Sequence, residues 1–232
     1  MKAPRASFVI PVKNGQKYLP EALSSCMAQS IKEIEIIVVN DGSSDGTREL
    51  LDFYVTEDKR IIPIHLEENV GRSKARNIGN AKVSSPFIFV LDADDRACKH
   101  RVRDTLITFN MKNPDLVYGP FFQIDELGQL IQKVGAGPFN KEISKLRKFN
   151  YICHSTMAYR TGVTKNVQYD EGPFSDLGLD DWKFQWEAHS RGYKFEVCKQ
   201  LLSYWRQSSD GISSNRDEQA VAKLKEEFLA TI

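Results

Sequence analysis

The first hundred residues alternate between short apolar runs and amphipathic stretches, and no other feature of the sequence constrains its fold as strongly. The apolar runs are rich in β-branched residues and lack a polar face, which is typical of strands in a parallel sheet covered on both sides. They occupy Ser7–Val12, Ile34–Asn40, Ile61–Leu66 and Phe87–Leu91. Helical spacing and N-capping residues predict helices at Tyr18–Ala28, Thr47–Val55, Arg72–Ala81 and His100–Met111. This alternation predicts a sandwich of βαβ units with a mainly parallel sheet.

The second half of the chain is less regular. We predict strands at Leu116–Asp125 and Tyr193–Tyr204, an extended segment at Tyr151–Arg160, a loop at Gln168–Gly178, and helices at Asn140–Phe149, Asp180–Ser190 and Asp217–Leu229. A length of 232 residues favours a single domain over two.

Composition excludes several classes of protein. Lys and Arg number 32 and Asp and Glu 31, so the chain lacks the basic excess of a nucleic-acid binder. No apolar run approaches the roughly 20 residues that span a bilayer, and the N-terminus lacks the apolar region of a signal peptide. The four cysteines are far apart, as expected of reduced thiols. We expect a cytoplasmic protein without a transmembrane segment, and this interpretation allows peripheral association with a membrane.

Polar residues follow all four predicted strands of the first half. They are Lys13-Asn14-Gly15, Asn40 to Gly46, Asn69-Val70-Gly71 leading to Arg72, Lys74 and Arg76, and Asp92-Ala93-Asp94-Asp95. Each group alone fits an ordinary solvated turn. In an open α/β sheet, however, ligands bind beyond the carboxyl ends of the strands, so four such groups together predict a site. The dinucleotide motif GxGxxG does not follow the first strand, and a P-loop is absent, which excludes two common nucleotide sites.

These strand ends belong to four motifs: VIPVKN from Val9, VVNDGSSDGT from Val38, NVGRSKARN from Asn69 and LDADD from Leu91. Together they resemble family 2 glycosyltransferases. The resemblance implies the α/β GT-A fold, a Rossmann-like three-layer αβα sandwich with a mainly parallel central sheet. It also implies inverting, metal-dependent transfer of a sugar from a nucleotide diphosphate donor, with a UDP-sugar favoured. The acceptor would be a glycan, a lipid-linked molecule or another hydroxyl compound, in a setting such as cell-surface polysaccharide biosynthesis. We expect one GT-A domain over residues 1–232, with a nucleotide-sugar-binding half (1–100) and an acceptor-binding half (101–232).

The resemblance assigns the donor-binding positions. They are Pro11, Val12, Asn14, Asp41, Gly71, Arg72, Arg76, Asp92, Ala93 and Asp94. Asp41 would accept a hydrogen bond from the nucleobase. Asp94, with Asp92 near it, would hold Mn²⁺ or Mg²⁺ beside the diphosphate. The alternative for Arg72, Lys74 and Arg76 is a solvated basic face on one helix.

The resemblance also places the catalytic base in the acidic pair Asp180–Asp181, and we assign it to Asp181. The charge of Asp180 would raise the pKa of Asp181 towards a useful value. The alternative is an ordinary carboxylate in the first turn of a helix.

Several other conspicuous side chains carry no such assignment. We expect His154 and Phe121 to be structural and Trp182 and Trp186 to belong to the core. Gln207 stands near the place where many family members have a metal-binding histidine.

Two other functions compete with sugar transfer. A sugar-nucleotide pyrophosphorylase would need a glycine-rich basic loop after the first strand, of which Lys13–Lys17 is a poor version. A non-catalytic nucleotide-sugar or glycan binding module would not need Asp92, Asp94 and Asp181.

Overall fold

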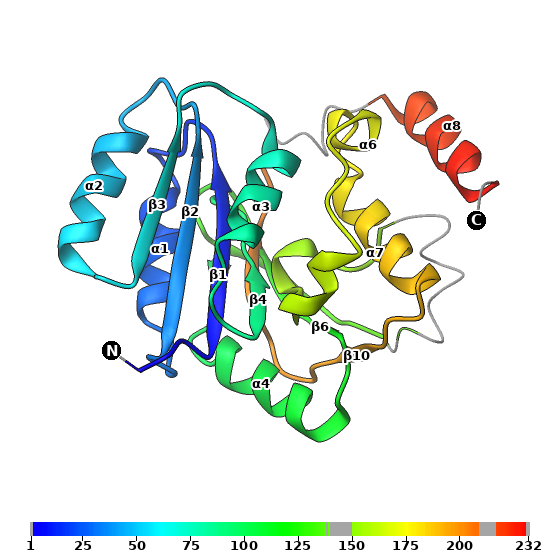
Figure 1. Ribbon diagram of the computed structural model, residues 1–232, viewed down its shortest axis with the longest axis horizontal. Coiled ribbons are helices and arrows are strands. Elements are labelled where there is room, and N and C mark those ends of the chain that lie inside the picture. Colours follow the sequence, from blue (N-terminus) through cyan, green and yellow to red (C-terminus); the bar gives the residue numbers. More distant parts are fainter. Residues whose placement is uncertain (1, 138, 140–149, 209–216, 231–232) are drawn as a thin grey trace.

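The computed structural model describes residues 2–137, 139, 150–208 and 217–230. Within them, a seven-stranded sheet runs in the order β10-β6-β9-β4-β1-β2-β3 (Figure 1). The strands are β1 (Ala6–Val12), β2 (Ile34–Asp41), β3 (Ile61–Leu66), β4 (Phe87–Val90), β6 (Leu116–Tyr118), β9 (Ala158–Arg160) and β10 (Phe195–Val197). All pairings are parallel except those of β9, which is antiparallel to β4 and β6. The prediction of a mainly parallel sheet is therefore confirmed.

Helices cover both faces of this sheet. On one face, α1 (Leu19–Met27), α2 (Thr47–Glu57) and α4 (Arg101–Lys112) bury apolar side chains against alternate strand residues such as Phe8 and Ile10. On the other face, Val9 packs in the same cluster as Trp182 and Phe184 of α7 (Asp180–Ser190). Helix α3 (Arg72–Ala81) covers that face of β1 and β2 (Figure 1). Successive strand side chains point to opposite faces, so each strand supplies both cores. The predicted three-layer αβα sandwich is confirmed.

A second, four-stranded sheet has the order β5-β11-β7-β8. Its strands are β5 (Arg96–Ala97), β11 (Ser203–Arg206), β7 (Phe121–Ile124) and β8 (Leu130–Val134). The predictions of single strands at Leu116–Asp125 and Tyr193–Tyr204 are therefore wrong, because each segment is divided between the two sheets.

Both breaks occur at the same place in the fold. Between β6 and β7, Gly119 lies so close to the neighbouring segment that a Cβ atom would be 2.9 Å from the carbonyl oxygen of Cys198. In the next residue, Pro120, the carbonyl accepts a hydrogen bond from Leu202 N at 2.9 Å. The two segments thus turn together, and β7 and β11 continue side by side into the second sheet.

The other predicted segments agree with the observed elements to different degrees. The helices at the start of the chain match to within two residues, and the C-terminal helix α8 spans Glu218–Leu229. The segment Tyr151–Arg160 is interrupted by a 3-10 turn, η1 (His154–Thr156), before β9, and a second turn, η2 (Thr161–Lys165), follows that strand. The predicted loop Gln168–Gly178 contains a short helix, α6 (Pro173–Asp176). The predicted helix Asn140–Phe149 lies outside the described residues.

No described helix combines the length and the apolar character needed to cross a membrane.

The loops after β1, β2 and β3 pack against one another at the carboxyl edge of the sheet. Asn14 N donates to Ser43 Oγ at 2.9 Å, and Asn14 Oδ1 accepts from Ser44 N at 2.9 Å. Gly42 has φ +58°, and a Cβ atom there would lie 2.6 Å from Asn69 N in the third loop. Only glycine fits so close to another backbone in this left-handed conformation.

Candidate active site

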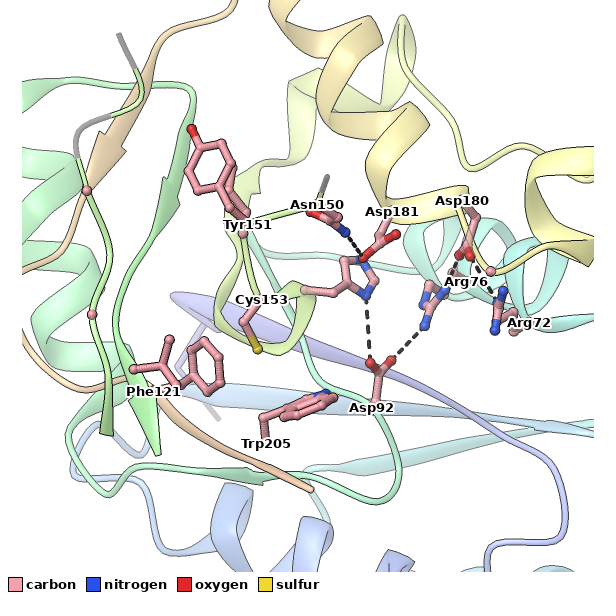
Figure 2. A pocket seen from close by; sticks show the side chains of 16 residues that line it. Arg72, Arg76, Asp92, Phe121, Asn150, Tyr151, Cys153, Asp180, Asp181 and Trp205 are labelled. Carbon is pink, nitrogen blue, oxygen red and sulfur yellow. Dashed lines mark hydrogen bonds and ion pairs between the residues drawn. The ribbon is translucent and has the colours of Figure 1, made fainter. Parts of the chain in front are cut away.

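A pocket of about 660 Å³ opens beside the carboxyl end of β4 and the N-terminal half of α3 (Figure 2). It has a charged end and an aromatic end. The charged end is lined by Arg72, Arg76, Asp92, His154, Asp180 and Asp181. The other end is lined by Phe121, Val134, Tyr151, Ile152 and Trp205, with Gly135, Gly137, Asn150, Cys153 and Gly178 completing the wall.

Arg76 joins two aspartates that lie far apart in the sequence. Its Nη2 donates to Asp92 Oδ1 at 2.6 Å, and its Nη1 donates to Asp180 Oδ2 (Figure 2). Burial alone would lower the pKa of Arg76, but the charges of Asp92 and Asp180 raise it above its usual range. Burial likewise raises the pKa of Asp92, yet Arg76 and His154 hold it well below the usual value. Asp92 is therefore a fixed, ionised carboxylate.

The Asp180 carboxylate connects α7 to α3. Asp180 is 3% exposed, and its Oδ1 accepts from Arg72 Nε at 3.0 Å. Arg72 also donates from Nη2 to the carbonyl of Ser175 at 2.7 Å. The alternative of a solvated basic face is wrong for Arg76, which is buried, and holds only for the exposed Lys74. The guanidinium groups of both arginines are already paired with Asp180.

Asp181, in contrast, faces the pocket. Its Oδ2 accepts from Asn150 Nδ2 at 2.5 Å, and its Oδ1 accepts from the Trp182 backbone N–H at 2.7 Å. Burial raises the pKa of Asp181, the charge of His154 opposes this, and the charge of Asp180 adds to it. The bond to Trp182 N also makes Asp181 a first-turn carboxylate, so that structural role coexists with its place at the pocket wall.

The other two carboxylates after β4 differ from Asp92. Asp95 is 1% exposed and accepts from Arg206 N at 2.8 Å, and its burial raises its pKa well above the usual value. Asp94 is half-buried, and burial together with the charge of Asp92 raises its pKa to about 6. Among the described residues, no basic side chain forms an ion pair with Asp94.

This donor set fits a divalent cation only in part. Among the described residues, no group of three His, Cys, Asp or Glu side chains could hold a metal ion. Asp92 is committed to Arg76, whereas Asp94 would be relieved by a cation at its oxygens. Hard oxygen ligands from a diphosphate and water could complete the coordination of Mg²⁺ or Mn²⁺. The residues present therefore fit a cation that arrives with a phosphorylated ligand.

Seven of the predicted donor-site residues lie at the strand ends outside the pocket lining: Pro11, Val12, Asn14, Asp41, Gly71, Ala93 and Asp94. Asp41 is 3% exposed, and its two oxygens accept from Val70 N at 2.6 Å and Gly71 N at 3.0 Å. Its carboxylate therefore fixes the loop that leads into α3. Gly71 has φ +89° and stands directly before that helix. The structure brings Arg72, Arg76, Asp92 and Asp181 together in the pocket and leaves the other predicted residues at strand ends outside its lining.

Two residues expected to be structural also line the pocket. His154 Nδ1 lies 3.8 Å from Asp92 Oδ2, and His154 Nε2 lies 2.9 Å from the Tyr169 hydroxyl. Phe121 makes an edge contact with Trp205, with ring centroids 6.2 Å apart. A lone histidine or phenylalanine in a strand-like segment carries no pattern that would have placed it here. Trp182 and Trp186 are 0% and 7% exposed, so the prediction that they belong to the core is confirmed.

Arg206 does not reach this site as a free cation. It is buried, donates from Nε to the carbonyl of Asp94 at 2.8 Å, and pairs with Glu21 at 2.8 Å. The neighbouring Gln207 is exposed and accepts from Gln123 Nε2 at 2.6 Å.

Comparison with known proteins adds independent findings. Residues 7–167 match the family described as Glycosyl transferase family 2. An uncharacterized glycosyltransferase of Methanocaldococcus jannaschii is 29% identical over 211 residues, covering 89% of this chain and 72% of that protein. The chain spans only 20–54% of the length of seven further curated relatives.

Two solved structures share the fold. S. aureus TarS 1–349 in complex with UDP-GlcNAc superposes with a TM-score of 0.77 at 20% identity, covering 98% of this chain and 66% of that one. The mannosyltransferase PcManGT from Pyrobaculum calidifontis, in complex with GDP-Man and Mn²⁺, gives a TM-score of 0.69 at 14% identity, covering 91% and 59%. The prediction of a glycosyltransferase from the four strand-end motifs is confirmed: the chain belongs to glycosyl transferase family 2.

Proposed function

We propose that this chain transfers a sugar from a nucleotide diphosphate donor, a UDP-sugar, to a hydroxyl acceptor with inversion of configuration. The observation that carries the proposal is the difference between two neighbouring carboxylates. Asp180 is buried and bound by two arginines, whereas Asp181 faces the pocket with a raised pKa. A base for an acceptor hydroxyl needs such a pocket-facing carboxylate, with a pKa closer to the working pH than an ordinary aspartate has.

The donor would lie across the carboxyl edge of β1, β2 and β4. In this proposal Pro11, Val12, Asn14, Asp41 and Gly71 bind the nucleoside, and Arg72, Arg76, Asp92, Ala93 and Asp94 lie around the diphosphate and sugar. Support comes from the ligands of the two fold neighbours, UDP-GlcNAc and GDP-Man. Val70 N and Gly71 N each donate to one oxygen of Asp41, and further lone pairs remain on these oxygens to accept from a nucleobase N–H.

Asp94 and the donor phosphates would hold Mn²⁺ or Mg²⁺, with Asp92 nearby. When bound, the cation would supply Lewis-acid stabilisation of the departing diphosphate. The Mn²⁺ named for PcManGT supports this assignment. Arg76 positions Asp92 and keeps it ionised from the other side.

The reaction would be a single displacement at the anomeric carbon. Asp181 accepts the proton of the acceptor hydroxyl while that oxygen bonds to the anomeric carbon, and the bond to the diphosphate oxygen breaks with its electron pair. Asn150, which donates to Asp181 Oδ2, orients the carboxylate for this step. We place the acceptor, a glycan or a lipid-linked molecule, in the half formed by residues 101–232, and the donor in residues 1–100 of one domain.

The proposal is tested by incubating the chain with UDP- and GDP-sugars, Mn²⁺ and a panel of glycan acceptors. Transfer is expected with one donor, and Asp181→Asn should abolish it while calorimetric donor affinity stays within about twofold, since a base acts in the transition state. The exposed Asp176→Asn in α6 is the matched control. Undiminished transfer by Asp181→Asn would remove the assigned base, and donor binding without any product would favour a binding module.

A further inference from the structure

The aromatic end of the pocket has no role in the donor chemistry described above. Trp205 and Phe121 both leave part of their surface in the cavity, whereas Trp182 and Trp186 are in the core. Large apolar surface turned towards solvent marks a place where a partner with an apolar face can bind.

The sequence builds this wall from two adjacent strands. β7 and β11 are parallel, with Phe121 opposite Ser203 and Gln123 opposite Trp205. Trp205 lies two residues beyond Ser203, so its side chain points to the same face as that of Phe121. The two rings meet at 80° with centroids 6.2 Å apart, which forms a corner with two differently oriented walls. Figure 2 shows Trp205 between Phe121 and the charged residues around Asp92.

The charges of the pocket restrict what can bind against this corner. The described lining contains two arginines, Arg72 and Arg76, and three aspartates, Asp92, Asp180 and Asp181. Both arginines are bound by Asp180, and Arg76 also by Asp92. With His154 counted as neutral, the formal charges of these five side chains sum to −1, and Asp181 is the one of the three aspartates that neither arginine binds. A second anionic group close to Asp181 would meet repulsion and no free guanidinium among these lining residues.

We propose that Trp205 and Phe121 form an acceptor subsite that takes a neutral sugar ring, and that this subsite excludes phosphorylated or uronic sugars. The inference rests on the proposed transferase function and names the acceptor class for it. The C–H face of a pyranose is apolar and carries partial positive charge, so it stacks on the electron-rich face of an indole. Its hydroxyls remain at the ring edge, and in this proposal one of them is directed along the pocket towards Asp181.

The subsite is tested by saturation-transfer NMR on the full chain without donor. The neutral probes are cellobiose, lactose and chitobiose, and the anionic probes are glucuronic acid and glucose 6-phosphate. At least one neutral sugar should receive saturation at its ring C–H protons. The anionic sugars should bind at least about tenfold more weakly, since they bring a like charge towards Asp181.

Variants assign the contact. Trp205→Ala should lower sugar affinity by about tenfold or more, and Trp205→Phe should restore part of it. Phe121→Leu keeps the volume and removes the second ring, so it serves if Trp205→Ala does not fold. Phe53→Ala removes an aromatic ring that is 57% exposed on α2, outside the pocket lining, and should change nothing.

Three results would overturn the subsite: no saturation of any neutral sugar, equal binding of anionic sugars, or unchanged binding in both Trp205→Phe and Phe121→Leu. Because this measurement uses neither donor nor turnover, its failure leaves the transferase proposal intact. Conversely, absence of transfer from every nucleotide sugar would count against the transferase and not against the sugar subsite.

Discussion

Asp180 and Arg76 form a buried ion pair that connects the first turn of α7 to α3, across 104 residues of sequence. Arg76 extends the connection to Asp92 at the end of β4. The proposed base Asp181 is the next residue after Asp180, so the same pair fixes the base relative to the carboxylates after β4. The two halves of the proposed reaction are thereby held in one rigid set of contacts.

Replacing Asp180 should therefore affect stability and catalysis in different ways. Asp180→Asn leaves the buried Arg76 with one fewer anionic partner, and we expect a loss of roughly 3 kcal/mol in the free energy of unfolding. Urea denaturation measures this loss, with the exposed Asp176→Asn as control. A loss no larger than that of the control would show that the pair contributes little to the fold.

The same variant should change the pH dependence of transfer. The charge of Asp180 contributes to the raised pKa of Asp181, so its removal lowers that pKa. Asp181 acts as a base only when ionised, and the acidic limb of kcat/KM should therefore move to lower pH. If the acidic limb of kcat/KM stays in place at saturating metal, the group that titrates there is not Asp181.

Replacing the Asp94 carboxylate with a neutral amide should stabilise the ligand-free protein. The pKa of the Asp94 carboxyl in the folded chain is raised to about 6 from an ordinary value of 3.8. The folded state then binds more protons than the unfolded state between these values, so stability falls as pH rises through them. Asp94→Asn removes this loss, and we expect the unfolding free energy at pH 7.5 to rise by about 1 kcal/mol, after allowing for solvent screening.

Thermal unfolding of Asp94→Asn and the native chain at pH 4 and pH 7.5 checks this expectation. The difference should be present at pH 7.5 and nearly absent at pH 4, where Asp94 is protonated in the folded protein. In the same samples, binding of UDP with Mn²⁺ should be weakened by the variant. A variant that is less stable than the native chain at pH 7.5 would show that Asp94 is already well satisfied.

The first half of the fold could be predicted because local patterns decide it. Helix Arg72–Ala81 and strand Ile61–Leu66 have the bounds expected from periodicity alone. The prediction of one strand over Leu116–Asp125 passed over a local signal, because Gly119-Pro120 is a turn dipeptide and stands between β6 and β7. What the local sequence does not show is the approach of Gly119 to Cys198, a contact between residues far apart in the chain.

The site shows the same division. A strand-end motif indicated Asp92, the family resemblance indicated Asp181, and the structure brings both to one pocket. The pairing of Arg76 with Asp180, however, depends on where α7 docks. The aromatic corner at Trp205 depends likewise on the register of β7 and β11. Neither relationship has a signal in local sequence.

Metal binding should depend on the nucleotide. The described chain offers Asp94 as its one uncommitted carboxylate after β4, and no cluster of three metal-binding side chains supports it. We expect Mn²⁺ titrated into nucleotide-free protein to show no micromolar binding by electron paramagnetic resonance, and UDP to enhance binding strongly. Micromolar binding without nucleotide that disappears in His154→Ala would place a further ligand at His154.

The last prediction concerns Gly42, which lies between Asp41 and the loop after β3. An added Cβ would approach the backbone of Glu68 and Asn69 to 2.6 Å, and φ is +58°. Backbone cannot move aside as a flexible side chain can, so Gly42→Ala should cost at least about 1 kcal/mol of stability and displace the loop that Asp41 holds. UDP affinity should fall with it, because the Asp41 carboxylate and Gly71 are expected to lie against the nucleoside. Gly162→Ala is the matched control, since a Cβ there meets nothing within 4 Å. Calorimetry with UDP and Mn²⁺ on both variants decides the matter: equal UDP affinity in the two would show that the packing of these loops does not shape the donor site.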